Sequence, residues 1–166
     1  SAWKNGVKAN LTWINAKEYE TGKRKISELA GFDGVVVPGG FGSSGIEGII
    51  KTIQFVREKK IPYFGLCYGM QLAVIEYARH VAGLKDAITS EIDPQARHKV
   101  IDIMHDQKKK LSEGNFGASM RLGAYLAVLK KGTLAEAAYG KELISERHRH
   151  RYEVNPEYIE RITSKG

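Results

Sequence analysis

The chain has 166 residues, 42% of them hydrophobic, which suits one globular domain with a sizeable core. A single cysteine excludes an internal disulfide and no apolar run is long enough to span a membrane, so we expect a cytoplasmic protein without membrane contact. The formal net charge of +7 gathers around the lysines at 108–110 with no aromatic residues interleaved, which argues against nucleic-acid binding.

The first predicted elements are two strands separated by a helix. Alternating polar and apolar residues at 7–14 predict a half-buried strand, and the charged segment 17–29 predicts a surface helix. The β-branched run at 34–38 predicts a fully buried strand that leads into a glycine loop.

A crossover helix and a second strand follow. Segment 46–60 has apolar residues at helical spacing, and the apolar run 61–66 predicts a buried strand before a helix at 70–78. A crossover of this length is right-handed and leaves its two strands parallel. The loops after the strands, at 39–42 and 67–68, then lie at the carboxyl edge of the sheet, where α/β folds place their sites.

Weaker patterns predict the later part of the chain. Residues 84–120 are less regular, whereas 120–129 and 143–154 are predicted to be strands. The sequence contains no internal repeat, low-complexity tract or linker. Together the elements predict an α/β domain.

The segment Gly65-Leu66-Cys67-Tyr68-Gly69 carries the single cysteine. A strand, then Gly-x-nucleophile-x-Gly, then a helix is the pattern of a nucleophile elbow. The glycines are needed because side chains at these positions would collide with neighbouring elements, and the helix N-terminus favours a thiolate. The alternative is a small buried hydrophobic residue. The flanking glycines favour the nucleophile.

The glycine loop after residue 37 offers partners for that chemistry. A thiolate that attacks a carbonyl creates an oxyanion, and backbone amides in Pro38-Gly39-Gly40-Phe41-Gly42 are rigid donors for it. The amide of Tyr68 is the second natural donor. The alternatives are a plain tight turn or a phosphate cradle, although the loop matches neither the Walker A nor the Gly-x-Gly-x-x-Gly pattern.

Cysteine chemistry also needs a base, which is normally histidine. None of the five histidines is a convincing base from local sequence: His80, His98, His105, His148 and His150. If the segment around the last two is extended, both lie on one face. A metal pair is the alternative for them, but no third Cys or His ligand is nearby, so we expect no metal site.

Several motifs cover nearly the whole chain in a fixed order: Pro38-Gly39-Gly40-Phe41-Gly42, Gly45-x-Glu47-Gly48, Gly65-x-Cys67-x-Gly69-Met70-Gln71, Ser90-Glu91-x-Asp93, Met120-Arg121-Leu122-Gly123 and Glu146-Arg147-His148-Arg149-His150-Arg151-Tyr152-Glu153-Val154-Asn155-Pro156. In this order they resemble the class I glutamine amidotransferase (glutaminase) domain of the CTP synthase family. The last motif, residues 146–156, is called the arginine-rich block and is the most specific of them. The resemblance implies a three-layer, doubly wound, mostly parallel sheet flanked by helices.

The resemblance also implies a mechanism. Cys67 would attack the side-chain amide of glutamine, giving a glutamyl thioester and ammonia, and water would then release glutamate. The amides of Gly40 and Tyr68 would form the oxyanion hole. The amino-acid end of glutamine would be bound by the side chains of Gln71, Glu91 and Arg151, because a carboxylate suits the α-ammonium and an arginine suits the α-carboxylate.

In the family, the ammonia passes to a synthetase domain, where ATP phosphorylates UTP and amination gives CTP. The resemblance therefore implies ATP, Mg and a GTP effector for the full enzyme, and no cofactor in this domain. It also implies a homo-oligomer, a tetramer, formed through the synthetase domain.

The sequence departs from the family's usual pattern at three places. The family's triad histidine and glutamate come from a downstream His-Pro-Glu segment, and this sequence stops at Gly166 before one. The strand and helix that open the family's domain are absent before 7–14. Ser44 and Tyr68 stand where arginine and leucine are usual. We therefore expect an amidotransferase domain over 1–166, incomplete at both ends and without the synthetase domain.

Two other interpretations remain open from the sequence. Another thiol amidohydrolase, such as a different amidotransferase or a γ-glutamyl hydrolase, would share the elbow and the glycine loop but not the arginine-rich block. A catalytically silent amidotransferase-like module that regulates a partner would explain the absent triad histidine.

Overall fold

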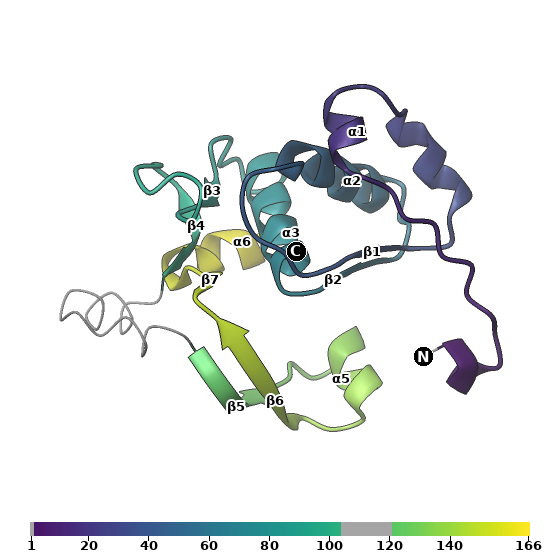
Figure 1. The fold of residues 1–166 in the computed structure, drawn as a ribbon. Helices are drawn as coiled ribbons and strands as arrows, with labels where there is room; N and C mark the ends of the chain where they lie inside the picture. The colour runs from purple at the N-terminus through teal and green to yellow at the C-terminus, as the bar shows by residue number, and fades with distance from the viewer. Residues whose placement is uncertain (1, 104–120) are drawn as a thin grey trace. The chain divides into compact units, whose positions relative to one another are not determined.

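A computed structural model describes residues 2–103 and 121–166, with the backbone alone at positions 3 and 121 (Figure 1). The chain divides into two compact units at the boundary between His80 and Val81. The first unit contains η1 (Ala2–Asn5), α1 (Lys17–Glu20), η2 (Ile26–Gly31), β1 (Val35–Val37), α2 (Ile46–Glu58), β2 (Tyr63–Gly65) and α3 (Tyr68–His80). The second contains β3 (Ile88–Thr89), β4 (Lys99–Ile103), β5 (Arg121–Val128), α5 (Leu134–Tyr139), β6 (Leu143–His150), β7 (Tyr152–Val154), η4 (Pro156–Tyr158) and α6 (Ile159–Thr163).

Strands β1 and β2 are parallel, with Val35 opposite Tyr63 and Val37 opposite Gly65. The predicted strand–helix–strand crossover is therefore confirmed, with α2 as its helix. Helices α2 and α3 lie on one face of the two strands (Figure 1). The parallel register brings the loops after β1 and β2 to the same edge of the sheet.

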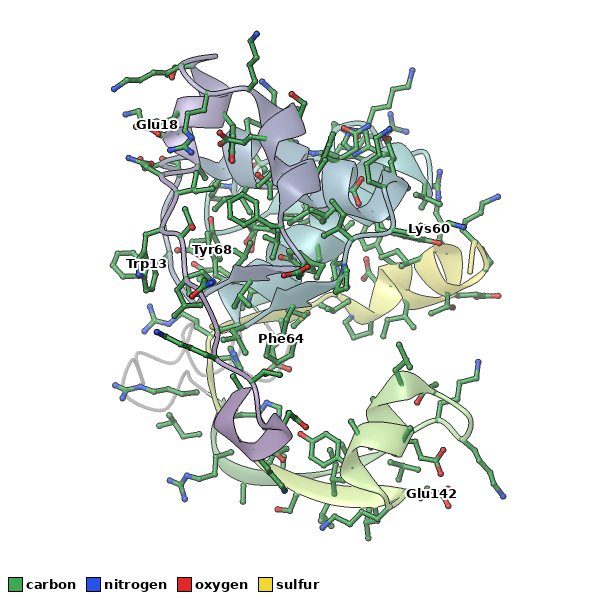
Figure 2. The ribbon with its side chains drawn as sticks, turned by 90° about the vertical axis from the view of Figure 1, so that its right-hand side faces the viewer. Trp13, Glu18, Lys60, Phe64, Tyr68 and Glu142 are labelled. Atoms are coloured by element: carbon green, nitrogen blue, oxygen red, sulfur yellow. The ribbon has the colours of Figure 1, made fainter. Side chains whose placement is uncertain are left out.

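The predictions of a fully buried strand at 34–38 and of a buried strand at 61–66 are wrong. Val36 and Phe64 lie opposite each other and are each 61% exposed, whereas Val37 is 8% exposed. Figure 2 shows the Phe64 side chain pointing away from the two helices. Within this unit the helices cover one face of the sheet, so the middle residue of each strand is exposed and the residues on either side of it are less so.

The first segments of the chain also differ from the prediction. Residues 7–14 form no strand and pair with no strand among the described residues, and Leu11 and Trp13 are 79% and 86% exposed. Alternation alone does not supply the neighbouring strand that a ladder needs. The single helix predicted over 17–29 is instead α1 and η2, because the chain turns at Gly22, where φ is +73°.

Helix α2 confirms the predicted amphipathic pattern. One stripe is buried, and it consists of Ile46, Gly48, Ile50, Thr52, Ile53 and Val56. Gly48 is required there because a Cβ at this position would lie 1.9 Å from the carbonyl oxygen of Ala16. The backbone before α1 therefore approaches α2 more closely than any side chain would allow.

Two ion pairs connect α2 to α3. Arg57 binds Glu76 at 2.8 Å, and Arg79 binds Glu47 at 2.9 Å. The Glu76 side chain is only 1% exposed, so removing Arg57 would leave a buried carboxylate without this ion pair. The hydrogen bonds from Arg57 to this carboxylate raise the pKa of the guanidinium.

The second unit contains two sheets. In the first, β3 and β4 are parallel and β4 and β7 are antiparallel. In the second, β5 and β6 form an antiparallel pair. The strands predicted at 120–129 and 143–154 are thereby found, the latter interrupted at Arg151, while α5 and α6 were not predicted. The side chain of Thr133 caps α5 by accepting a hydrogen bond from the amide of Glu136.

The predicted lysine-rich loop at 108–110 and His105 lie outside the described residues. In the described ranges, no helix combines the length and the apolar character that crossing a bilayer requires. The same residues contain no group of three or more His, Cys, Asp or Glu side chains arranged to hold a metal ion.

Candidate active site

Cys67 lies in the turn between β2 and α3, and its backbone is left-handed with φ at 53°. A residue with a Cβ is strained in this conformation, and such strain is found at active sites. The turn is held by the amide of Gly69, which donates to the carbonyl of Leu66 at 2.9 Å, and by the amide of Gln71, which donates to the carbonyl of Cys67 at 3.1 Å. The predicted strand–turn–helix arrangement is therefore present.

The thiol is exposed, which contradicts the alternative of a buried hydrophobic cysteine. Both flanking glycines are required by packing. A Cβ at Gly65 would lie 2.6 Å from the backbone of Gly69 and Met70, and a Cβ at Gly69 would lie 2.3 Å from the carbonyl oxygen of Val37. Real Cβ atoms do not come this close to backbone, so only glycine fits at either position.

The glycine loop that follows β1 lies directly beside the cysteine. A Cβ at Gly39 would be 3.4 Å from the Cβ and 3.9 Å from the Sγ of Cys67. A Cβ at Gly40 would be 3.5 Å from the ring of Tyr68. The glycine loop therefore packs against Cys67 and Tyr68, at the start of α3.

Two tyrosine side chains form hydrogen bonds with these segments. Tyr68 is 6% exposed, and its hydroxyl donates to the carbonyl oxygen of Gly42 at 2.5 Å. The hydroxyl of Tyr63 donates to the carbonyl oxygen of Gly69 at 2.8 Å, and burial raises the pKa of Tyr63 well above its ordinary value. From the sequence, a role is predicted for the backbone amide of Tyr68 but not for its side chain or for Tyr63.

The three remaining candidates for glutamine binding fall in different units. Gln71 is 5% exposed and lies on α3, one turn after Cys67. Glu91 and Arg151 lie in the second unit, and both act on the hydroxyl of Tyr152: burial first, and then the charge of Glu91, raise its pKa, whereas Arg151 lowers it. The structure thus brings Glu91 and Arg151 to one neighbourhood around Tyr152, a residue that sequence reasoning missed although it directly follows Arg151.

The described histidine side chains contact groups other than Cys67. Nδ1 of His80 lies 3.1 Å from the buried carboxylate of Glu76 in α3. His98 lies 3.3 Å from the hydroxyl of Tyr158. The rings of His148 and His150 are 5.7 Å apart on β6, on one face as predicted. None of these contacts involves Cys67.

Comparisons with known proteins identify similar sequences and structures. The family model for the class-I glutamine amidotransferases matches residues 1–165. A CTP synthase of Methanococcoides burtonii is 51% identical over 97% of this chain, and one of Clostridium acetobutylicum is 53% identical over 98%. The chain spans about 30% of the length of each of these relatives.

A solved structure gives the same result. The Trypanosoma brucei CTPS glutaminase domain with bound acivicin matches with a TM-score of 0.86 and 35% identity, covering 98% of this chain and 61% of the other. The matches confirm the resemblance that the sequence motifs indicated, and the structural match confirms the predicted α/β fold class.

Proposed function

The chain belongs to the class-I glutamine amidotransferase family, and from this premise we propose that it hydrolyses glutamine to glutamate and ammonia, with Cys67 as the nucleophile. The observation that carries this proposal is the exposed thiol on a left-handed residue between two glycines that no other residue can replace. This arrangement presents a side chain to a substrate at the end of a strand.

The reaction would proceed in two steps. Sγ of Cys67 attacks the carbonyl carbon of the glutamine side chain, and the amides of Gly40 and Tyr68 stabilise the oxyanion. Collapse of this intermediate breaks the C–N bond, releases ammonia and leaves a glutamyl thioester. Water then attacks the thioester carbonyl, which frees glutamate and the thiol. The resemblance assigns the proton transfers to a histidine that is not in this sequence.

The amino-acid end of glutamine would be bound by Glu91 and Arg151. The carboxylate of Glu91 suits the α-ammonium group, and the guanidinium of Arg151 suits the α-carboxylate. The shared effect of these two charges on Tyr152 supports their pairing in one binding region. The resemblance also assigns Gln71, one turn beyond the nucleophile on α3, to glutamine binding.

We further propose that residues 1–166 form the amidotransferase domain of a larger enzyme. The relatives are named CTP synthase and are about three times as long as this chain. In such an enzyme the ammonia would aminate UTP in an ATP- and Mg-dependent reaction on a synthetase domain, with GTP as an effector, and the assembly would be a cytoplasmic homo-tetramer.

Removal of the thiol tests the proposal. In the complete polypeptide that carries this chain, Cys67→Ala is expected to reduce glutamine hydrolysis to background, a loss of at least about 1,000-fold, because the covalent intermediate does not form. Acivicin, the compound bound in the trypanosome domain, is expected to add to Cys67 of the unmodified protein, as measured by mass spectrometry. Equal turnover in the two proteins, or no adduct, would favour a catalytically silent module.

The binding residues give a second test. Glu91→Ala and Arg151→Ala are each expected to raise KM for glutamine by about tenfold with a smaller change in kcat, because these charges bind substrate and transition state alike. Steady-state kinetics measure both constants. The matched control is Arg161→Ala, which removes an exposed arginine of α6. A variant with unchanged KM and collapsed kcat would contradict the assignment.

A further inference from the structure

The glycine loop beside Cys67 contains three glycines within four residues, at 39, 40 and 42. Glycine loses more conformational freedom on ordering than any other residue. An oxyanion hole, in contrast, must hold its donors in a fixed position before the reaction begins. A loop of this composition therefore needs a contact from outside its own backbone.

The side chain of Tyr68 makes such a contact at two positions of the loop, Gly40 and Gly42. Its hydroxyl donates to the carbonyl oxygen of Gly42 at 2.5 Å, and its ring lies 3.5 Å from the position of a Gly40 Cβ. The side chain is 6% exposed although it belongs to the first residue of α3. The residue that would donate its amide to the oxyanion thus also holds the loop that carries the other donor.

We propose that the phenol of Tyr68 is a positioning group that fixes the glycine loop 39–42 over the thiol, so that the amide of Gly40 points to the oxyanion. This inference rests on the proposed glutaminase function and adds a role for a side chain to it. Because Tyr68 follows Cys67 directly, one short segment sets the position of the nucleophile and of both donors. The ring fills space against Gly40, and the hydroxyl fixes the loop at Gly42.

Tyr68→Phe in the complete polypeptide tests this role, because it keeps the ring and removes only the hydroxyl. We expect kcat for glutamine hydrolysis to fall about tenfold, the order set by the net worth of one hydrogen bond, while KM changes by less than about twofold. Hydrogen exchange of the peptide covering 38–45 should become faster. Alkylation of Cys67 by iodoacetamide, which uses no oxyanion hole, should keep its rate.

Two further variants make the test specific. Tyr19→Phe removes a phenol of the same unit that donates to Glu28 at 2.6 Å, and should change neither kcat nor loop exchange. Tyr68→Leu removes the ring as well and should lower kcat at least as far as Tyr68→Phe.

The outcomes separate the two proposals. Wild-type kcat and loop exchange in Tyr68→Phe, or restoration of both in Tyr68→Leu, would overturn the positioning role. Slower alkylation in parallel with a lower kcat would also overturn it, because the thiol itself would then be displaced. If the unmodified protein does not hydrolyse glutamine, the proposed function fails, and the exchange measurement still decides whether Tyr68 holds the loop.

Discussion

Two residues of the first unit share one unusual backbone conformation in very different surroundings. Lys60 has φ at 55° and Cys67 has φ at 53°, and among the described residues no other non-glycine residue has positive φ. Lys60 lies just after the end of α2 and is exposed; it is labelled in Figure 2. Cys67 lies directly before α3.

At Lys60 the left-handed residue ends a helix. Its amide donates to the carbonyl of Arg57 at 3.2 Å, and the amide of Ile61 donates to the carbonyl of Val56 at 2.9 Å. These bonds use carbonyls that the last turn of a helix leaves unpaired, so the conformation has a structural purpose. At Cys67 the turn instead requires glycine on both sides and places an exposed thiol beside a second loop. Positive φ by itself therefore does not identify a site, whereas its surroundings do.

The largest expected effect comes from the glycine that the elbow requires. Gly69→Ala should destabilise the unit by about 3 kcal/mol or more, because its Cβ would overlap the backbone of Val37 and neither element can yield cheaply. Urea-induced unfolding measures this loss. Gly31→Ala is the control, since a Cβ there meets nothing within 4 Å, and should change stability little. An unfolding midpoint of Gly69→Ala equal to that of the unmodified protein would mean that the elbow tolerates a side chain.

A smaller effect is expected at Arg57, which contacts both Lys60 and helix α3. Arg57 accepts the hydrogen bond of Lys60 through its carbonyl, and its side chain pairs with the buried Glu76 of α3. Arg57→Ala should destabilise the unit by about 2 kcal/mol, because a buried carboxylate loses its main partner, reduced by the 34% exposure of the arginine. Arg24→Ala removes a pair whose carboxylate, Glu28, is 33% exposed rather than 1%, and should cost less in the same unfolding measurement. Equal losses would show that burial of Glu76 does not matter.

The smallest effect concerns the strained backbone itself. Lys60→Gly and Cys67→Gly should each stabilise the unit by about 1 kcal/mol, since glycine adopts positive φ without a Cβ penalty. Only the second substitution should remove the reaction with acivicin. Unfolding and mass spectrometry of the two variants measure both quantities. Destabilisation by Cys67→Gly would mean that contacts of the thiol offset the strain.

Local sterics explain why the elbow could be predicted from the sequence. The spacing of Gly65, Cys67 and Gly69 determines a turn whose glycines are required by atoms within a few residues or on the adjacent strand. The crossover and α2 could be predicted for a similar reason, because their patterns follow from helix and strand periodicity. The strand predicted at 7–14 needed a neighbour that alternation does not reveal.

The rest of the candidate site depends on contacts between distant segments. The bond from Tyr68 to Gly42 joins residues 26 positions apart, and nothing in the local sequence of either one indicates it. Tyr152 acquires its relation to Glu91 only when β4 and β7 pair. The exposure of Val36 and Phe64 was missed because an apolar strand does not show how many of its faces are covered.

One backbone atom, the carbonyl oxygen of Val37, joins the elements of the elbow. It accepts the amide of Leu66 at 2.9 Å and lies 2.3 Å from where a Gly69 Cβ would be, and the glycine loop begins immediately after it. A protein engineer who transplants only the five residues 65–69 into another scaffold would therefore lose the strand against which the start of α3 packs. The smallest portable version of this reactive centre includes β1 and its loop.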